Sequence, residues 1–141
     1  MRRDGAFPAR AALVLAALSL AGCASVGAPS CPPGGRERVV ADLMFGRNIG
    51  GAPGVSERSF ARFVDAEVTP RFPDGLTILD TRGQYRSANG ALIREPGKVI
   101  TIVLADEARD LPRLAEVAEA YKRRFRQESV GVITRRACVA F

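Results

Sequence analysis

The side chains of this chain that could do chemistry are Asp, Glu, Arg, Lys, Tyr, Ser and Cys, because its 141 residues include no histidine. Without an imidazole, Ser-His-Asp and Cys-His catalysis and most zinc sites are excluded. Two segments concentrate polar groups: "GRNIGGAPGVS" carries Arg47 and Asn48, and "TPRFPDGLT" carries Arg71 and Asp74. These four residues are the candidate ligand-binding set. The pattern designates no catalytic residue, metal site or cofactor.

The glycine-rich segment 46–56 is expected to connect a strand to a helix, where backbone N–H groups can hold a phosphate. It lacks both the Gly-Lys-Ser/Thr of a P-loop and the G-x-G-x-x-G spacing of dinucleotide-binding loops. Two interpretations remain open. Arg47 and Asn48 bind an anion, or the glycines merely permit positive φ in a connecting loop. In the second segment, we expect Asp74 to cap its turn and Arg71 to pair with Asp65 or Asp74.

The N-terminus has the pattern of an export signal. Three arginines, Arg2, Arg3 and Arg10, precede residues 11–20, which are apolar except for Ser19. A run of ten residues is too short for a membrane span, which needs about 20. The alternative, a buried helix of the domain, is disfavoured because residues 24–36 continue without a helical pattern.

The signal ends in Leu20-Ala21-Gly22-Cys23, which resembles the bacterial lipobox. The resemblance implies that residues 1–22 are removed, that Cys23 carries a diacylglyceryl group, and that its new amino group is acylated. Two or more acyl chains hold a protein stably on a membrane. Because residue 24 is Ala and not Asp, the resemblance further implies a lipid-anchored envelope protein, on the periplasmic face of the outer membrane where the host has two membranes.

The segment after Cys23 is rich in Pro, Gly, Ala and Ser, so we expect residues 23–37 to form a lipidated tether. Lipidation would leave Cys31 and Cys138, which an oxidising compartment favours as a disulfide. The alternative is a reactive thiol at Cys138. The disulfide is the preferred interpretation, because the fold predicted below brings the two cysteines to one edge of a sheet.

Residues 38–141 are expected to form one domain with the order β-α-β-β-α-β. Strands are predicted at 38–45, 76–86, 91–104 and 129–141, with a bend at "EPGK" (95–98) whose Lys98 is solvated. One helix follows Ser56; the other begins near Asp110 and Pro112 and buries Tyr121 in its apolar stripe. This order is typical of the ferredoxin-like split βαβ sandwich, an antiparallel α+β sheet with both helices on one face and strand order 4-1-3-2.

The strand 99–104 contains one polar residue, Thr101, so both faces of the sheet should be apolar there. Helices cover one face, and two candidates remain for the other: a second copy of the chain, or the hairpin 86–98 folded back. Nucleic acid is disfavoured as a partner, because the part after the signal has a charge of only +4 and no basic stripe with aromatics.

Several motifs of the domain resemble the bacterial family known as domain of unknown function 3574, many of whose members are secreted or lipid-anchored. The matching motifs are Phe45-Gly46-Arg47, residues 68–76, residues 121–130 and the ending "ACVAF". This resemblance implies no particular biochemical activity and no catalytic residues. The first hypothesis is therefore an envelope-anchored domain with a binding or structural role. The alternative is a dimeric small-molecule enzyme that uses Arg, Asp and Tyr.

Overall fold

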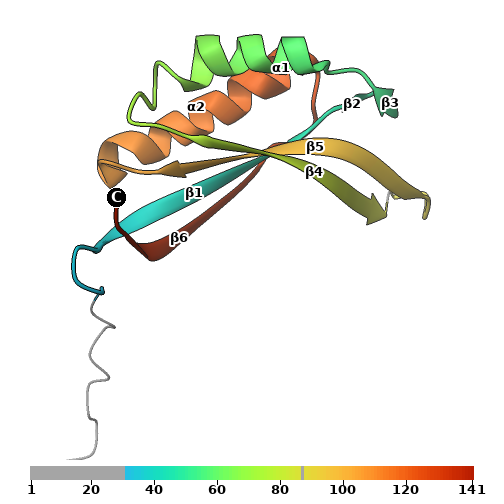
Figure 1. The fold of residues 1–141 in the computed structure, drawn as a ribbon. Helices are drawn as coiled ribbons and strands as arrows, with labels where there is room; N and C mark the ends of the chain where they lie inside the picture. Colours follow the sequence, from blue (N-terminus) through green and yellow to red (C-terminus); the bar gives the residue numbers. More distant parts are fainter. Residues whose placement is uncertain (1–30, 87) are drawn as a thin grey trace, which may run out of the picture. The chain divides into compact units, whose positions relative to one another are not determined.

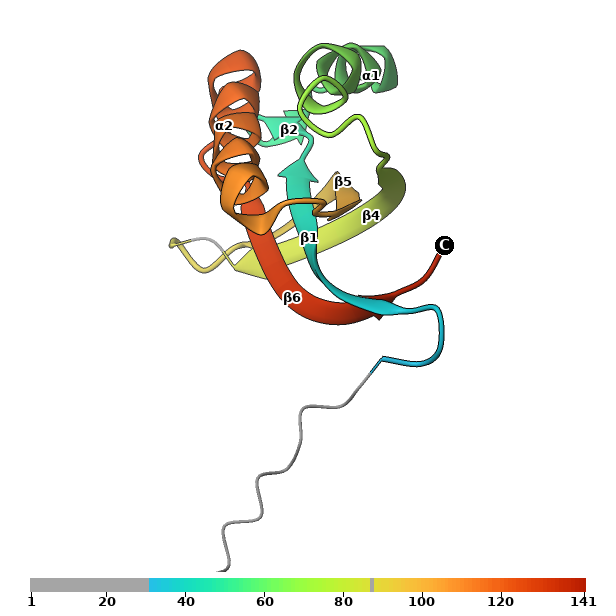
Figure 2. The ribbon, with the colours of Figure 1, turned by 90° about the vertical axis from the view of Figure 1, so that its left-hand side faces the viewer.

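The computed structural model describes residues 31–86 and 88–141. The predicted signal peptide, Cys23 and most of the predicted tether therefore lie outside the described residues. A curved sheet carries two helices on one of its faces (Figures 1 and 2). The elements are β1 (Arg36–Gly46), β2 (Asn48–Ile49), β3 (Ala52–Pro53), α1 (Glu57–Phe63), a π-helical segment (Val64–Val68), β4 (Thr77–Arg86), β5 (Leu92–Val103), α2 (Glu107–Phe125) and β6 (Gly131–Val139).

The main sheet has the strand order β4-β5-β1-β6, and every neighbouring pair is antiparallel. Counting the four long strands along the chain, this is the 4-1-3-2 order of the ferredoxin-like plan. The predicted α+β class and topology are therefore confirmed. The small β2–β3 hairpin lies within the glycine-rich segment and was not expected.

Each of the two helices begins directly after a residue whose side chain caps its N-terminus. The hydroxyl of Ser56 accepts a hydrogen bond from the Ser59 N–H at 3.1 Å, as predicted for α1. The start expected for α2 near Asp110 is wrong, because Asp106 is the cap and accepts from the Arg109 N–H at 3.1 Å. The buried carboxylate of Asp110 accepts from the Asp106 N–H at 3.0 Å. Its ion pair with Arg109 and that hydrogen bond lower its pKa, although burial opposes them.

The core lies between the helices and the sheet and is built around aromatic rings. Neighbouring rings meet edge to face or tilted, with centroids 4.7–6.4 Å apart. Tyr121 is fully buried, as predicted, and its hydroxyl donates to the Gly46 carbonyl at 2.8 Å. Burial raises its pKa. The ring cluster consists of Phe45, Phe60, Phe63, Tyr121 and Phe125.

The bend expected at "EPGK" is absent. β5 runs through it, with Glu95 opposite Gly83 and Pro96 opposite Arg82. A proline is tolerated there because the β1–β5 pairing ends at Gly97, and on that side Pro96 needs only its carbonyl, which accepts from the Arg47 N–H at 3.1 Å. The β4–β5 hairpin continues the sheet outward and does not fold back over it (Figure 1).

The sheet face away from the helices is called the open face. Asp42 lies near its middle and accepts a hydrogen bond from the Thr101 hydroxyl at 2.6 Å. Asp42 also forms an ion pair with Arg135, and both contacts hold its pKa below the usual value. Ile133, opposite Asp42 on β6, exposes 49% of its surface, and Met44 and Leu79, one step further toward the end of β1, expose 40% and 51%. The open face therefore has a polar centre with an apolar patch at the end where β1 stops.

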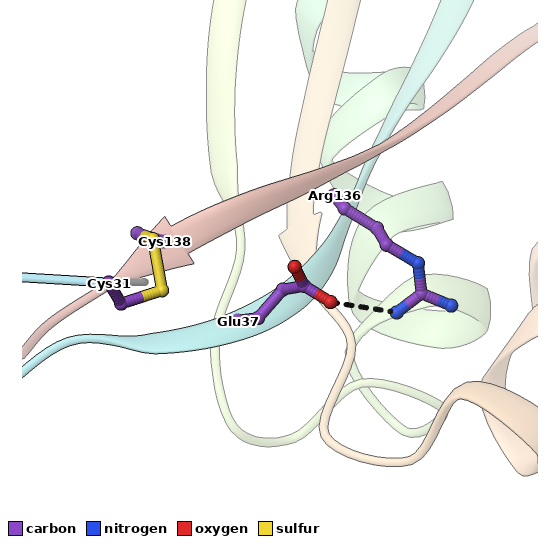
Figure 3. Close-up of a disulfide and its surroundings, with 4 residues drawn as sticks. All are labelled: Cys31, Glu37, Arg136 and Cys138. Carbon is purple, nitrogen blue, oxygen red and sulfur yellow. Dashed lines mark hydrogen bonds and ion pairs between the residues drawn. A yellow bond between two sulfur atoms is a disulfide. The ribbon is translucent and has the colours of Figure 1, made fainter. Parts of the chain in front are cut away.

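A disulfide joins Cys31 to Cys138 at the opposite end of β1 (Figure 3). The two Cα atoms are 5.4 Å apart, and an ion pair between Glu37 and Arg136, 3.4 Å long, lies beside the bridge. The bond is possible because β1 and β6 are antiparallel neighbours, so the residues before β1 meet the end of β6. In residues 31–86 and 88–141, no helix is long and apolar enough to cross a membrane.

Candidate functional site

The glycine-rich segment forms a tight hairpin instead of a phosphate cradle. Asn48 pairs with Pro53 and Ile49 with Ala52, so Gly50 and Gly51 occupy the turn. Their φ angles are +59° and +85°, which are the values of a type I′ turn and favour glycine at both positions. Gly50 and Gly51 therefore permit the positive φ angles of a connecting turn, which is the second of the two interpretations given above.

Arg47 holds the two ends of this segment together. Its Nε donates to the Val55 carbonyl at 2.8 Å, and its Nη1 pairs with the Glu57 carboxylate. The Gly54 and Val55 N–H groups donate back to the Arg47 carbonyl at 2.9 and 3.0 Å. The guanidinium thus binds an internal carboxylate, and it is only partly exposed.

The prediction that Lys98 is solvated is wrong. It is 6% exposed and lies between the carboxylates of Glu57, at 2.7 Å, and Asp80. Burial alone would lower its pKa, but the hydrogen bonds and charges of Asp80 and Glu57 prevail and raise it. Lys98 is a charged cross-link between α1, β4 and β5, which makes it unsuitable as an amine nucleophile or general base.

Asn48 lines a groove of about 620 Å³ where the hairpin, the β4–β5 extension and the α2–β6 loop meet. We call it the Asn48 groove. The Asn48 Oδ1 atom is buried and has no hydrogen-bond partner within the described residues. Its backbone is held in place, because Gln127 Nε2 donates to the Asn48 carbonyl at 2.6 Å. An orphaned buried acceptor costs free energy until a donor reaches it, so this amide is the strongest local signal of a ligand or a structural water. Other lining residues include Met44, Tyr85, Glu95, Val99 and Gln127.

The second predicted pair does not join this groove. Arg71 donates to the Glu116 carboxylate at 3.1 Å and to the Glu67 carboxylate at 3.0 Å, so its expected pairing with Asp65 or Asp74 is wrong. Those contacts tie the π-helical segment to α2. Asp74 lines a different groove, which adjoins the start of β4.

That second groove has a volume of about 680 Å³ and lies at the disulfide end of the open face. We call it the arginine groove, because Arg36 and Arg38 of β1 line it. Its other walls come from β4, β5 and the last residues of the chain, among them Thr77, Val103, Val139 and Phe141. Within the described residues, no group of three or more His, Cys, Asp and Glu side chains could hold a metal ion.

Sequence reasoning missed Arg36, Arg38, Tyr85, Glu95 and Lys98. For the two arginines a signal existed: in "RERV" the charges alternate with the strand period, so both arginines share one face and Glu37 the other. For Lys98 no local signal exists, because its burial depends on Glu57 and Asp80, which are distant in the chain.

Together, the antiparallel sheet, the two helices on one face and the grooves at both ends of the open face define a small ferredoxin-like α+β domain. The chain belongs to the family described as "Protein of unknown function (DUF3574)", whose family model matches residues 40–141. The predicted family membership is therefore confirmed. No curated protein matches the chain.

Solved structures of a phage SAM lyase are similar in fold. The lyase in complex with S-methyl-5'-thioadenosine has a TM-score of 0.59 and 18% sequence identity, over 80% of this chain and 95% of the lyase chain. The lyase in its apo state has a TM-score of 0.57 and 18% identity, over 81% and 96%. At this identity the likeness concerns the fold.

Proposed function

We propose that this protein is an envelope lipoprotein, anchored through Cys23, whose domain binds a small molecule in the Asn48 groove. The single observation that carries the binding role is the buried Asn48 Oδ1, which has no hydrogen-bond partner among residues 31–86 and 88–141. The groove volume of about 620 Å³ is in the range of small-molecule sites. The lipobox-like Leu20–Cys23 segment supports the anchor.

The groove favours a ligand with a planar ring and hydrogen-bond donors. Asn48 and Glu95 offer acceptors, and the half-exposed ring of Tyr85 offers a stacking surface. A nucleoside combines these properties, since its base is planar and its amino and hydroxyl groups donate. The phage lyase of the same fold was solved with such a molecule, S-methyl-5'-thioadenosine, which makes thioether nucleosides the first class to try.

The test is a calorimetric titration of the purified full-length protein with S-methyl-5'-thioadenosine. We expect saturable binding that Asn48→Ala weakens by about 3–10-fold, the loss of one hydrogen bond of roughly 0.5–1.5 kcal/mol. Gln84→Ala is the matched control, because Gln84 is an exposed amide on β4 outside the groove. Equal affinities of the two variants would show that Asn48 does not contact the ligand. Absence of binding would show that the groove does not take thioether nucleosides.

A second candidate function is an enzyme acting on such a nucleoside. Tyr85 and Glu95 line the same groove, so a phenol and a carboxylate are available for proton transfer. The name of the fold relative, SAM lyase, adds weak support. Incubation with SAM followed by chromatography tests it. An enzyme breaks the bond between sulfur and the amino-acid chain, so that S-methyl-5'-thioadenosine leaves and the amino-acid fragment closes on its own carboxylate or takes up water. Both products should form faster than in buffer, and Glu95→Gln should slow their release. Release at the buffer rate leaves the binding role alone.

We further propose that two copies associate through the apolar end of the open face and enclose the Asn48 groove between them. Met44 belongs to both this patch and the groove lining, and its half-buried neighbour Val99 also lines the groove, so a partner copy there would exclude water from the ligand. Together with Leu79 and Ile133 they form an apolar surface that the β4–β5 hairpin leaves uncovered.

Neighbouring residues of β4 provide a matched test of this dimer. Leu79 exposes 51% of its surface on the open face, whereas Ile78 exposes 41% on the helix side. Leu79→Glu should convert a dimer into a monomer in native mass spectrometry or light scattering, because it buries a charge in the interface. Ile78→Glu should leave the protein dimeric. A monomeric unmodified protein, or a dimer that survives Leu79→Glu, would contradict the proposed interface.

A further inference from the structure

The arginine groove is lined by two cations, Arg36 and Arg38, that form no ion pair within residues 31–86 and 88–141. Glu37 lies between Arg36 and Arg38 in the chain, but strand alternation turns it to the helix side, where it pairs with Arg136 at 3.4 Å. In the part of the chain that the structure describes, Arg36 and Arg38 have no ion pair. The Cα atoms of residues two apart on one strand face are about 7 Å apart, so a single anion can lie between the two guanidinium groups.

The walls of the groove suit an anion with an apolar body. Thr77 and Thr101 add hydroxyl groups, and Leu76, Val103 and Val139 add apolar surface. Phe141 also lines the groove and its side chain is fully exposed. An exposed aromatic ring beside arginines is the combination by which proteins contact the interface of an anionic bilayer. Asp74 and the α-carboxylate of Phe141, where the sequence ends, also belong to the lining, so the attraction for an anion is local to Arg36 and Arg38.

The position of the groove relative to the proposed anchor points to the same partner. Eight chain steps separate Cys23 from Cys31, which at full extension span at most about 28 Å. The disulfide fixes Cys31 to Cys138, and the next residue, Val139, pairs with Arg36 and lines the groove. A turn closed by the Gly35 N–H on the Pro32 carbonyl, at 2.9 Å, then leads directly into Arg36. A lipid on Cys23 would therefore keep this end of the domain close to the membrane.

We propose that the arginine groove binds the anionic headgroup of a phospholipid in the membrane that anchors the protein. Arg36 and Arg38 contact the phosphate, and Phe141 enters the interfacial region. The domain is thereby held with its disulfide end toward the bilayer. The nearness of the membrane rests on the proposed lipid anchor, whereas the affinity of the groove for the headgroup does not.

Arginine modification by phenylglyoxal, resolved by peptide mass spectrometry, tests this proposal on the full-length protein. The protein is reconstituted into vesicles of phosphatidylcholine alone or of phosphatidylcholine with phosphatidylglycerol. We expect the anionic vesicles to slow modification of Arg36 and Arg38 by about fivefold each, the factor for one arginine at an anionic surface. High salt should reverse the protection. Arg58 and Arg123, exposed on α1 and α2, are internal controls and should react equally in both vesicles.

Three outcomes would overturn the proposal. Equal modification of Arg36 and Arg38 in both vesicles would show that the groove does not bind the headgroup. Equal slowing of Arg58 and Arg123 would show general surface adsorption. Protection by inorganic phosphate alone in phosphatidylcholine vesicles, as strong as that by phosphatidylglycerol, would assign the groove to a soluble phosphate. The intact mass of the same sample reports separately whether Cys23 is acylated, so a missing anchor and a non-binding groove are distinguishable.

Discussion

Replacing Cys23 with serine is expected to move the protein from the membrane fraction to the soluble fraction. The thiol is the attachment point for the proposed diacylglyceryl group, and two or more acyl chains are needed for stable anchoring. The apolar run 11–20 cannot replace the lipid, because ten residues are too short to span a bilayer. Fractionation after high-salt washing measures the effect, and intact mass shows whether acyl chains are lost.

The other two cysteines provide the control. A Cys31→Ala/Cys138→Ala variant keeps Cys23 and should stay in the membrane fraction. Its circular dichroism should match that of the Cys23→Ser protein, since neither change touches the aromatic core. Retention of Cys23→Ser in washed membranes, at the unmodified level, would contradict the lipid anchor.

The Cys31→Ala/Cys138→Ala variant should, however, lose much of its stability. The bridge joins residues 107 positions apart and therefore constrains nearly the whole described domain when unfolded. For a loop of this length, the chain-entropy model predicts a loss of about 4–5 kcal/mol, which we treat as an upper bound. The corresponding fall in Tm is roughly 15 °C for a domain of this size.

Denaturant unfolding with and without a reductant checks this result. The reductant should lower the unfolding midpoint of the unmodified protein and leave that of the double variant unchanged. If both proteins unfold at the same midpoint without a reductant, the two thiols are not joined in solution. A Cys138 that reacts with iodoacetamide in the folded, unreduced protein would favour the alternative of a reactive thiol.

Local patterns were enough to predict the fold. The apolar alternation in 38–45, the β-prone 99–104 and the helical spacing of the two apolar stripes define the element order. Right-handed crossovers and antiparallel pairing then leave few ways to arrange four strands and two helices. The prediction of a bend at "EPGK" was wrong. Pro and Gly favour turns locally, but pairing with β4 from Thr77 to Arg86 keeps β5 continuous.

The candidate site was predicted only in part. Asn48 lies in a groove, but Arg47 is occupied by Glu57, and Arg71 by Glu67 and Glu116. Sequence spacing cannot show which carboxylate lies next to an arginine when the two are separated by ten or by 45 residues. Tyr85 and Glu95 reach the groove through the register of the β4–β5 hairpin, which pairs them with Ile93 and Gly83, two further residues of the groove lining.

The sequence by itself determined the export pattern, the family and the α+β topology, because these depend on composition, motif order and hydrophobic period along the chain. Only the tertiary structure decided which polar groups are satisfied. Burial and pairing depend on neighbours from distant strands and helices. In the part of the chain that the structure describes, such neighbours place Lys98 between Glu57 and Asp80. They also leave the Asn48 Oδ1 without a hydrogen-bond partner, and Arg36 and Arg38 without an ion pair.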